Sequence, residues 1–89
     1  MAVLTFAPAI QRHVPMPELT VSAGTVREML DIAFAGQPQL RGYIVDDQGS
    51  LRRHVAIFVD GTMIRDRERM SDAVRDGSRV YVVQALSGG

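Results

Sequence analysis

The chain has 89 residues, of which 46% are hydrophobic and 22% charged, and its formal net charge is zero. At this length the chain forms one domain, and no apolar run approaches the roughly 18 residues that span a bilayer. Because there is no net positive charge to attract polyanions, we expect neither nucleic acid nor a membrane as a partner.

The first segment predicts a hairpin. Residues 1–5 lack the basic start and long apolar stretch of a secretory signal, so we expect a cytoplasmic protein. Residues 3–7 are typical of a strand, and Pro8 limits where it can end. Residues 9–17 contain two further prolines, and we expect a turn or a sheet edge there. Residues 18–21 form the returning strand.

The next segment predicts the main helix. Thr25 and Glu28 have the spacing of a capping box, in which each side chain satisfies the backbone amide of the other residue. The apolar residues that follow recur at helical spacing and form one face of about three turns. They are Val26, Met29, Leu30, Ala33 and Phe34. Gly36 and Pro38 end this helix.

Two apolar segments follow the main helix. Residues 40–45 predict one helical turn and then extended chain, which a polar turn over residues 46–50 reverses. Residues 55–59 are the most apolar strand-like run of the chain, and the Asp-Gly pair after it is typical of a tight turn. Residues 62–64 then form a short partner strand.

The connection to the last strand is polar. Arginines alternate with acids over residues 65–69, and because the acids cancel the basic charge, we interpret this stretch as solvated rather than as a basic patch. Ser71 caps a brief turn, and a second Asp-Gly pair at residues 76–77 turns the chain again. Arg79 begins the final strand.

The order of these elements predicts the fold class. A hairpin, one main helix, a strand, a short strand and a final strand form an α+β layer, in which a mixed sheet of four to five strands packs on the helix. We expect the final strand to lie beside the first and parallel to it, which is the β-grasp arrangement. Residues 1–85 would form this domain, and residues 86–89 a flexible tail.

The chain ends in Ser87-Gly88-Gly89, directly after the apolar run 80–86. Glycine has no Cβ atom, so this end can pass through a channel only as wide as a backbone. It could carry the α-carboxylate of Gly89 into the active site of another protein. The alternative interpretation is a frayed terminus or the remnant of a linker.

Three sequence blocks occur in a characteristic order: Phe58-Val59-Asp60-Gly61, Val74-Arg75-Asp76-Gly77-Ser78-Arg79-Val80 and Ser87-Gly88-Gly89. Together they resemble the ubiquitin-like sulfur-carrier family that includes MoaD and ThiS. The resemblance covers nearly the whole chain, and residues 43–59 look more like the longer carriers of molybdopterin and cysteine biosynthesis. The chain departs from the family pattern at three positions, where the family more often has Asn, an acid and a nearby Pro; these are Asp60, Ser78 and Gln84.

The resemblance implies a function. A ubiquitin-activating-type adenylyltransferase would use ATP to adenylate Gly89, and a sulfur donor would then leave a terminal thiocarboxylate. An acceptor synthase subunit would receive this sulfur in a pathway such as that of molybdopterin or cysteine, while the carrier itself would bind no cofactor. Two alternatives stay open: a protein modifier joined through Gly89 to lysines of other proteins, and a β-grasp binding module with an inert tail.

The chain offers little chemistry of its own. It has no cysteine, and His13 and His54 are its only histidines, so we expect no metal site. No serine lies in the context of a nucleophile elbow, and the glycines are too scattered for a phosphate-binding loop. We therefore expect no catalytic residue and no enzyme, and the resemblance implies a carrier. Lysine is absent too, which reflects either codon usage or the exclusion of amines that would capture an activated carboxyl group.

Strand alternation predicts a partner surface. Ala56 and Phe58 in one strand, and Tyr81 and Val83 in the last strand, point away from the helix. If these strands are neighbours, Phe58, Tyr81 and Val83 form an exposed apolar patch at the base of the tail, and we expect them to bind partners together with Leu86. The alternative is that residues 36–50 cover this face and make it core.

Overall fold

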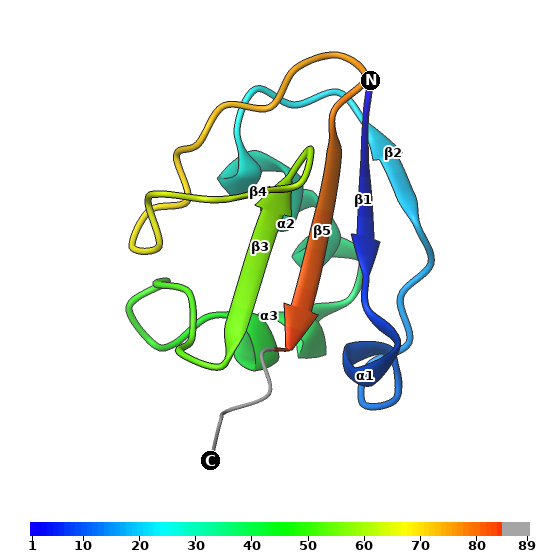
Figure 1. Ribbon diagram of the computed structural model, residues 1–89. Helices are drawn as coiled ribbons and strands as arrows, with labels where there is room; N and C mark the ends of the chain where they lie inside the picture. The colour runs from blue at the N-terminus through cyan, green and yellow to red at the C-terminus, as the bar shows by residue number, and fades with distance from the viewer. Residues whose placement is uncertain (85–89) are drawn as a thin grey trace.

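Five strands form the framework of the molecule (Figure 1): β1 (Ala2–Phe6), β2 (Leu19–Val21), β3 (Val55–Val59), β4 (Thr62–Met63) and β5 (Arg79–Gln84). The computed structural model describes residues 1–84 of the chain. The strands make one mixed sheet in the order β2-β1-β5-β3-β4, so the last strand of the chain lies at its centre.

The pairing of the strands confirms the predicted β-grasp fold. β1 runs antiparallel to β2 and parallel to β5, with Leu4 opposite Val80. On its other side β5 runs antiparallel to β3, with Phe58 opposite Tyr81. The first and last strands are therefore neighbours and parallel, as the order of elements predicts.

The hairpin between β3 and β4 has the tight turn that the Asp-Gly pair predicts. Asp60 and Gly61 both have positive φ angles, of 50° and 86°, as the two central residues of a type I′ hairpin turn require. Asp60 also accepts a hydrogen bond through Oδ1 from the amide of Arg79 (2.9 Å). The aspartate that departs from the family pattern thus joins the turn to the start of β5.

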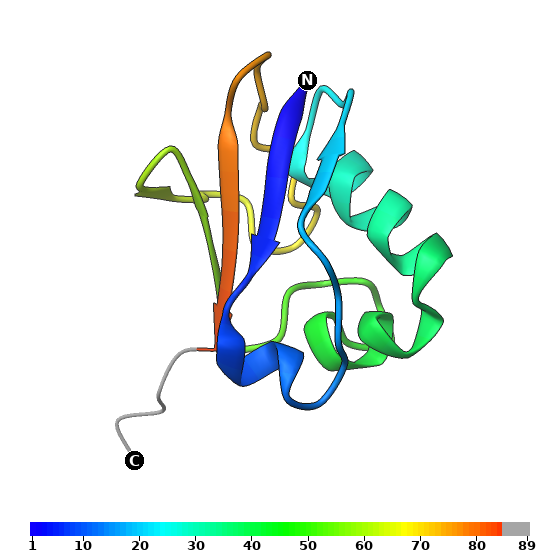
Figure 2. The same ribbon diagram turned by 90° about the vertical axis from the view of Figure 1, so that its right-hand side faces the viewer.

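The main helix, α2 (Val26–Gly36), lies across one face of the sheet (Figure 2). Its predicted capping box is present, since the amide of Glu28 donates to Thr25 Oγ1 (3.2 Å) and the amide of Thr25 donates to Glu28 Oε1 (3.2 Å). The predicted apolar face is confirmed, because these five side chains are buried in the core: Val26, Met29, Leu30, Ala33 and Phe34.

Two shorter helices correct the sequence interpretation. Residues 9–17 begin in α1 (Pro8–Gln11), a helical turn rather than a plain turn or edge, and α3 (Pro38–Ile44) has seven residues where a single turn was predicted. Both helices begin at a proline, whose fixed φ suits the first helical position and whose missing amide is not needed there. Within residues 1–84, no helix has the length and apolarity that crossing a bilayer requires.

The connection between β4 and β5 accepts hydrogen bonds from the first backbone amides of α2. The amide of Val26 donates to the carbonyl of Asp72 (3.1 Å), and the amide of Arg27 donates to the carbonyl of Met70 (2.9 Å). The amides in the first turn of a helix have no partner within that helix, so this connection stabilises the N-terminus of α2. Met70 is fully buried and has a φ of 53°, an unusual angle for a residue with a side chain.

The same connection is less solvated than its charge pattern predicts. Arg67 is half-buried and donates through Nη2 to the carbonyls of Arg52 (2.7 Å) and Val55 (2.8 Å). The predicted turn capped by Ser71 is wrong, because its hydroxyl donates to the carboxylate of Asp66 and no helical turn follows. The alternating charges did not predict the contacts of Arg67, because they are made to backbone carbonyls of a segment distant in sequence.

Candidate functional site

β5 carries the chain to the end of the molecule at which α1 and α3 lie (Figures 1 and 2). Its last residue is Gln84. The predicted tail residues Leu86, Ser87, Gly88 and Gly89 lie outside the described residues, as does the predicted boundary between domain and tail. The part of the site that the structure describes is the base of the tail and the surface around it.

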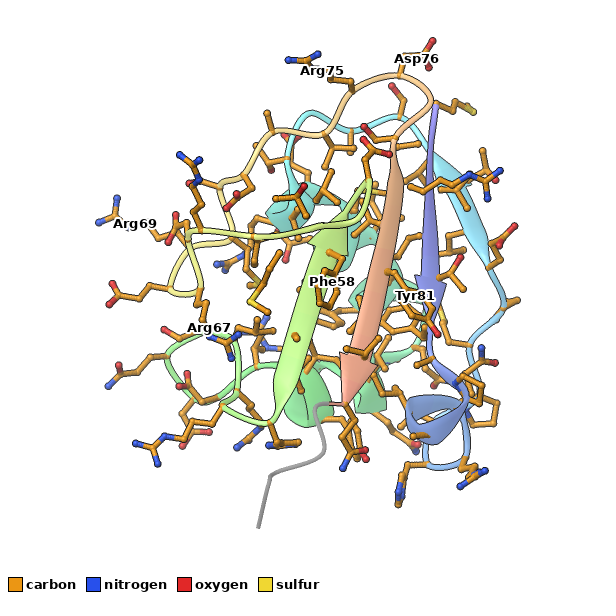
Figure 3. The ribbon with its side chains drawn as sticks, viewed as in Figure 1. Phe58, Arg67, Arg69, Arg75, Asp76 and Tyr81 are labelled. Atoms are coloured by element: carbon orange, nitrogen blue, oxygen red, sulfur yellow. The ribbon has the colours of Figure 1, made fainter. Side chains whose placement is uncertain are left out.

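Four apolar side chains lie together on the face of the sheet opposite α2. Phe58 pairs with Tyr81 across β3 and β5, and with Met63 across β3 and β4. Figure 3 shows Phe58 and Tyr81 next to one another on this open face. Tyr81 is 41% exposed and Met63 is 50% exposed. We call Phe58, Met63, Tyr81 and Val83 the sheet-face patch.

The structure brings together the three described residues that strand alternation predicts for this patch. The alternative in which residues 36–50 cover the open face is wrong, because Leu40 and Ile44 pack into the core on the opposite face. Ala56, which alternation also places on this face, is only 7% exposed. Sequence reasoning missed Met63, because a strand of two residues is too short to show alternation. Partner binding by the patch stays a prediction.

A side-chain contact holds the base of the tail. The hydroxyl of Tyr43, in α3, donates to Oε1 of Gln84 (2.8 Å). The ring of His13 stacks on Tyr43 with a centroid distance of 5.1 Å, and His54 meets the same ring edge-on at 6.3 Å. Sequence reasoning did not foresee this cluster, because its members come from four separate segments. It connects α3 to the point at which β5 ends.

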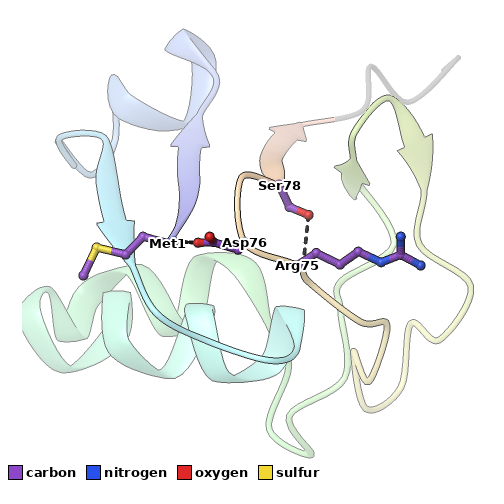
Figure 4. Close-up of polar contacts among 4 residues, drawn as sticks. All are labelled: Met1, Arg75, Asp76 and Ser78. Carbon is purple, nitrogen blue, oxygen red and sulfur yellow. Dashed lines mark hydrogen bonds and ion pairs between the residues drawn. The ribbon is translucent and has the colours of Figure 1, made fainter.

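The opposite end of β5 is held by a turn against the start of the chain (Figure 4). The amide of Arg75 donates to Oγ of Ser78 (3.0 Å), and the amide of Ser78 donates back to the carbonyl of Arg75 (3.0 Å). The amino group of Met1 forms an ion pair with Asp76. Ser78 is buried, which explains why a serine suits a position where the resemblance more often shows an acid. This turn sets the start of β5 beside the start of β1.

Neither a metal site nor a pocket is found within the described residues. No group of three His, Cys, Asp or Glu side chains within residues 1–84 could hold a metal ion, and the same stretch opens no pocket. His13 and His54 instead pack against Tyr43. The features described above, the sheet-face patch and the base of the tail, are surface features.

A family model for the ThiS family matches residues 9–89. The chain belongs to the ThiS family. The match runs through all five residues that follow Gln84 and so includes the predicted tail. As a ThiS-family protein, the chain is a small ubiquitin-like sulfur carrier, a substrate of other enzymes and not an enzyme itself.

Solved structures of ubiquitin-like proteins match this ThiS-family chain over almost its whole length. CysO in the BexX/CysO complex of Amycolatopsis orientalis has a TM-score of 0.82 at 18% identity and covers 100% of both chains. CysO of Mycobacterium tuberculosis scores 0.80 at 19% identity, covering 97% of this chain and 100% of its own. SAMP1 of Haloferax volcanii scores 0.78 at 19% identity, covering 99% of this chain and 98% of its own. At these identities the likeness shows the fold alone. No curated protein matches the sequence significantly.

Proposed function

We propose that this carrier acts through a thiocarboxylate on Gly89. A carboxylate oxygen of Gly89 bonds to the α-phosphorus of ATP on an activating enzyme, and pyrophosphate leaves. Hydrosulfide, or a donor that supplies it, then bonds to the carbonyl carbon, and AMP leaves. The terminal carboxylate has thereby exchanged one oxygen for sulfur, which the carrier donates in a biosynthetic pathway of the molybdopterin, cysteine or a related type.

The observation that carries this proposal is the family match through the Gly-Gly end of the chain. A free α-carboxylate has a pKa near 3.5, so at neutral pH it is an anion and a poor electrophile until it is activated. Gly88 and Gly89 have no Cβ atoms, which suits passage of the terminus through a narrow channel. The carrier needs no cofactor of its own, because the activating enzyme supplies the ATP chemistry.

The sheet-face patch supports docking on the activating enzyme. Exposed aromatic and apolar side chains are the groups that most often contribute binding energy in protein interfaces. The patch reaches the base of the tail through Val83, so a partner that covers it would also receive the terminus. One matched structure is a complex of a CysO protein with BexX, and we propose an analogous acceptor enzyme for this carrier.

A second candidate is a protein modifier, in which Gly89 forms isopeptide bonds with lysines of target proteins. Matched structures that are described as small archaeal modifier proteins favour keeping it. The first step, adenylation of Gly89, is the same in both candidates. They differ in the nucleophile that displaces AMP, which is sulfur in one case and an amine in the other.

Intact-mass measurement separates the candidates. The carrier is incubated with a purified activating enzyme, ATP and sodium sulfide, with a parallel sample that lacks ATP as the control. A mass gain equal to the difference between sulfur and oxygen, absent from the control, supports the sulfur carrier. Isopeptide-linked adducts in a lysate that contains the activating enzyme, with no exchange of oxygen for sulfur, would favour the modifier instead.

A further inference from the structure

The end of the molecule from which β5 emerges carries an uneven charge. Three segments meet there: α1 with the residues after it, α3, and the loop between α3 and β3 that follows Leu51 (Figure 1). The amide of Ala7, just before α1, donates to the carbonyl of Val82 in β5 (2.8 Å), and the amide of Arg52 in the loop donates to the carbonyl of Ile44 in α3 (3.0 Å). The Tyr43 cluster described above joins all three segments.

This end is basic although the whole chain has no net charge. Residues 7–17, 36–45 and 51–59 contain no aspartate or glutamate, whereas they contain four of the ten arginines and both histidines. All ten acidic residues lie in the remaining parts of the chain. We call the six basic side chains the basic collar: Arg12, His13, Arg41, Arg52, Arg53 and His54.

Three arginines of the collar are available to a partner, whereas Arg52 donates through Nε to the carbonyl of Gly42 (2.8 Å). Arg12, Arg41 and Arg53 are exposed. The ion pairs within residues 1–84 join Met1 to Asp76 and Arg27 to Asp31, so none of them neutralises an arginine of the collar. Three of the four acids that flank these segments in sequence, Glu18, Asp46 and Asp60, accept hydrogen bonds, while Asp47 is exposed. Glu18 accepts a hydrogen bond from Thr5, and Asp46 accepts amides of its own turn.

We propose that the basic collar docks on an acidic protein surface around the opening of the partner's active site. This inference rests on the proposed function and adds the chemistry of the partner surface to it. A neutral protein with one basic end is attracted and oriented by an acidic surface, so that the end with the tail arrives first. The sheet-face patch then contributes apolar contact, while the collar accelerates correct encounters.

An acidic protein surface fits the collar better than a phosphate or a nucleic acid. The four arginines are spread over three separate segments of the chain, whereas a phosphate site draws its donors toward one point. Nucleic-acid binding draws on a strong net positive charge, which this chain lacks. A protein with a channel, in contrast, can place carboxylates around the five residues that follow Gln84.

The test compares two triple variants with the same change of net charge. The collar variant carries Arg12→Gln, Arg41→Gln and Arg53→Gln, and the control variant carries Arg65→Gln, Arg69→Gln and Arg75→Gln, which are also exposed. Association with the purified activating enzyme is followed by stopped-flow fluorescence over a range of salt concentrations. At low salt we expect the collar variant to associate about tenfold more slowly than the wild type, and the difference to disappear at high salt. Equal losses in both variants would overturn the proposal.

A peptide titration tests the wild-type protein directly. Hexaglutamate is titrated into isotope-labelled carrier and followed by NMR, with inorganic phosphate and a short oligonucleotide as the other probes. We expect the peptide to shift amides of residues 7–17, 38–45 and 51–54 more than phosphate does. Shifts with phosphate or the oligonucleotide alone would contradict the proposal.

The two proposals fail in different ways. If the wild type binds the enzyme in a salt-dependent, collar-dependent manner but never gains sulfur, the proposed sulfur chemistry is wrong and the collar proposal stands. If the wild type gains sulfur and the collar variant associates as fast as the wild type, only the collar proposal is wrong.

Discussion

Gln84 shows how single residues hold the base of the tail. Its side chain accepts a hydrogen bond from the hydroxyl of Tyr43, a residue 41 positions earlier in the chain. Rings of His13 and His54 pack on the same tyrosine. The resemblance places a proline near this position, and a proline would restrict the backbone before the tail. In this chain the hydrogen bond between Tyr43 and Gln84 restrains the end of β5 instead.

Removal of the Tyr43 hydroxyl tests this contact. We expect Tyr43→Phe to lower the free energy of unfolding by about 1 kcal/mol, because a half-buried hydrogen bond is lost while the ring remains. Chemical denaturation measures the change. Tyr81→Phe is the matched control, since the hydroxyl of Tyr81 has no hydrogen-bond partner among the described residues and its loss should leave the stability unchanged. Equal effects of the two changes would show that the contact contributes nothing.

Asp66 predicts how stability depends on pH. The Ser71 hydroxyl, followed by the amide of Arg69, stabilises the carboxylate and lowers the pKa of Asp66 below its ordinary value of 3.8. A group with a lowered pKa in the folded state stabilises the fold fully above its unfolded pKa, and this contribution is lost as the pH falls through the folded value. The wild type should therefore lose its advantage over Asp66→Asn below about pH 4. Thermal unfolding of both proteins from pH 7 to pH 3 measures this, and a constant difference would contradict it.

At the scale of elements, the two faces of the sheet differ in burial. One face packs against α2 and α3, while the other leaves the sheet-face patch exposed. Alternation along β3 and β5 produces this division, because neighbouring residues of a strand point to opposite faces. The central position of β5 then places Tyr81 between residues of β1 and β3, and β5 ends at the side of the molecule where α1 and α3 lie.

Tyr81→Asp separates the interaction surface from the fold. Tyr81 lies on the open face, so we expect a folded protein whose stability falls by no more than about 1 kcal/mol. Binding to the activating enzyme should weaken by about 2 kcal/mol or more, because a charge would enter an apolar interface. Calorimetry measures the binding and circular dichroism the fold. Thr20→Asp, at an exposed position on the edge strand β2, is the control and should bind normally.

At the scale of the whole molecule, stability and reactivity are assigned to different parts of the chain. Within residues 1–84, the hydrophobic core contains side chains from all three helices and from the sheet. The proposed reactive group is the carboxylate of Gly89, outside the described residues. In the proposed function, the globular domain presents the terminus and carries the surfaces that recognise partners.

Deletion of Gly88 and Gly89 tests this division of tasks. We expect the melting behaviour to stay the same, with a change in unfolding free energy within about 0.5 kcal/mol, because no core residue is removed. Adenylation, measured as ATP-pyrophosphate exchange on the activating enzyme, should be abolished. Normal exchange by the shortened chain would contradict a role for the Gly-Gly terminus.

The parts of the fold that were predicted correctly have local causes. The capping box at Thr25 and Glu28 and the apolar face of α2 depend on spacing within a few turns, and the Asp-Gly turn depends on two adjacent residues. The helices α1 and α3 were underestimated because their prolines were interpreted as breaks, although a proline can also begin a helix.

The sequence by itself determined the order of the elements and the inward and outward positions along β3 and β5, because periodicity and composition are local properties of a chain. It also determined the Gly-Gly end, which the family match includes. Only the tertiary structure decided which face stays open, that Met63 joins Phe58 and Tyr81, and that Tyr43 holds Gln84. It also decided that three separate segments with basic residues meet at one end of the molecule (Figure 1). These features arise from contacts between residues distant in sequence, and such contacts depend on how the sheet and helices pack.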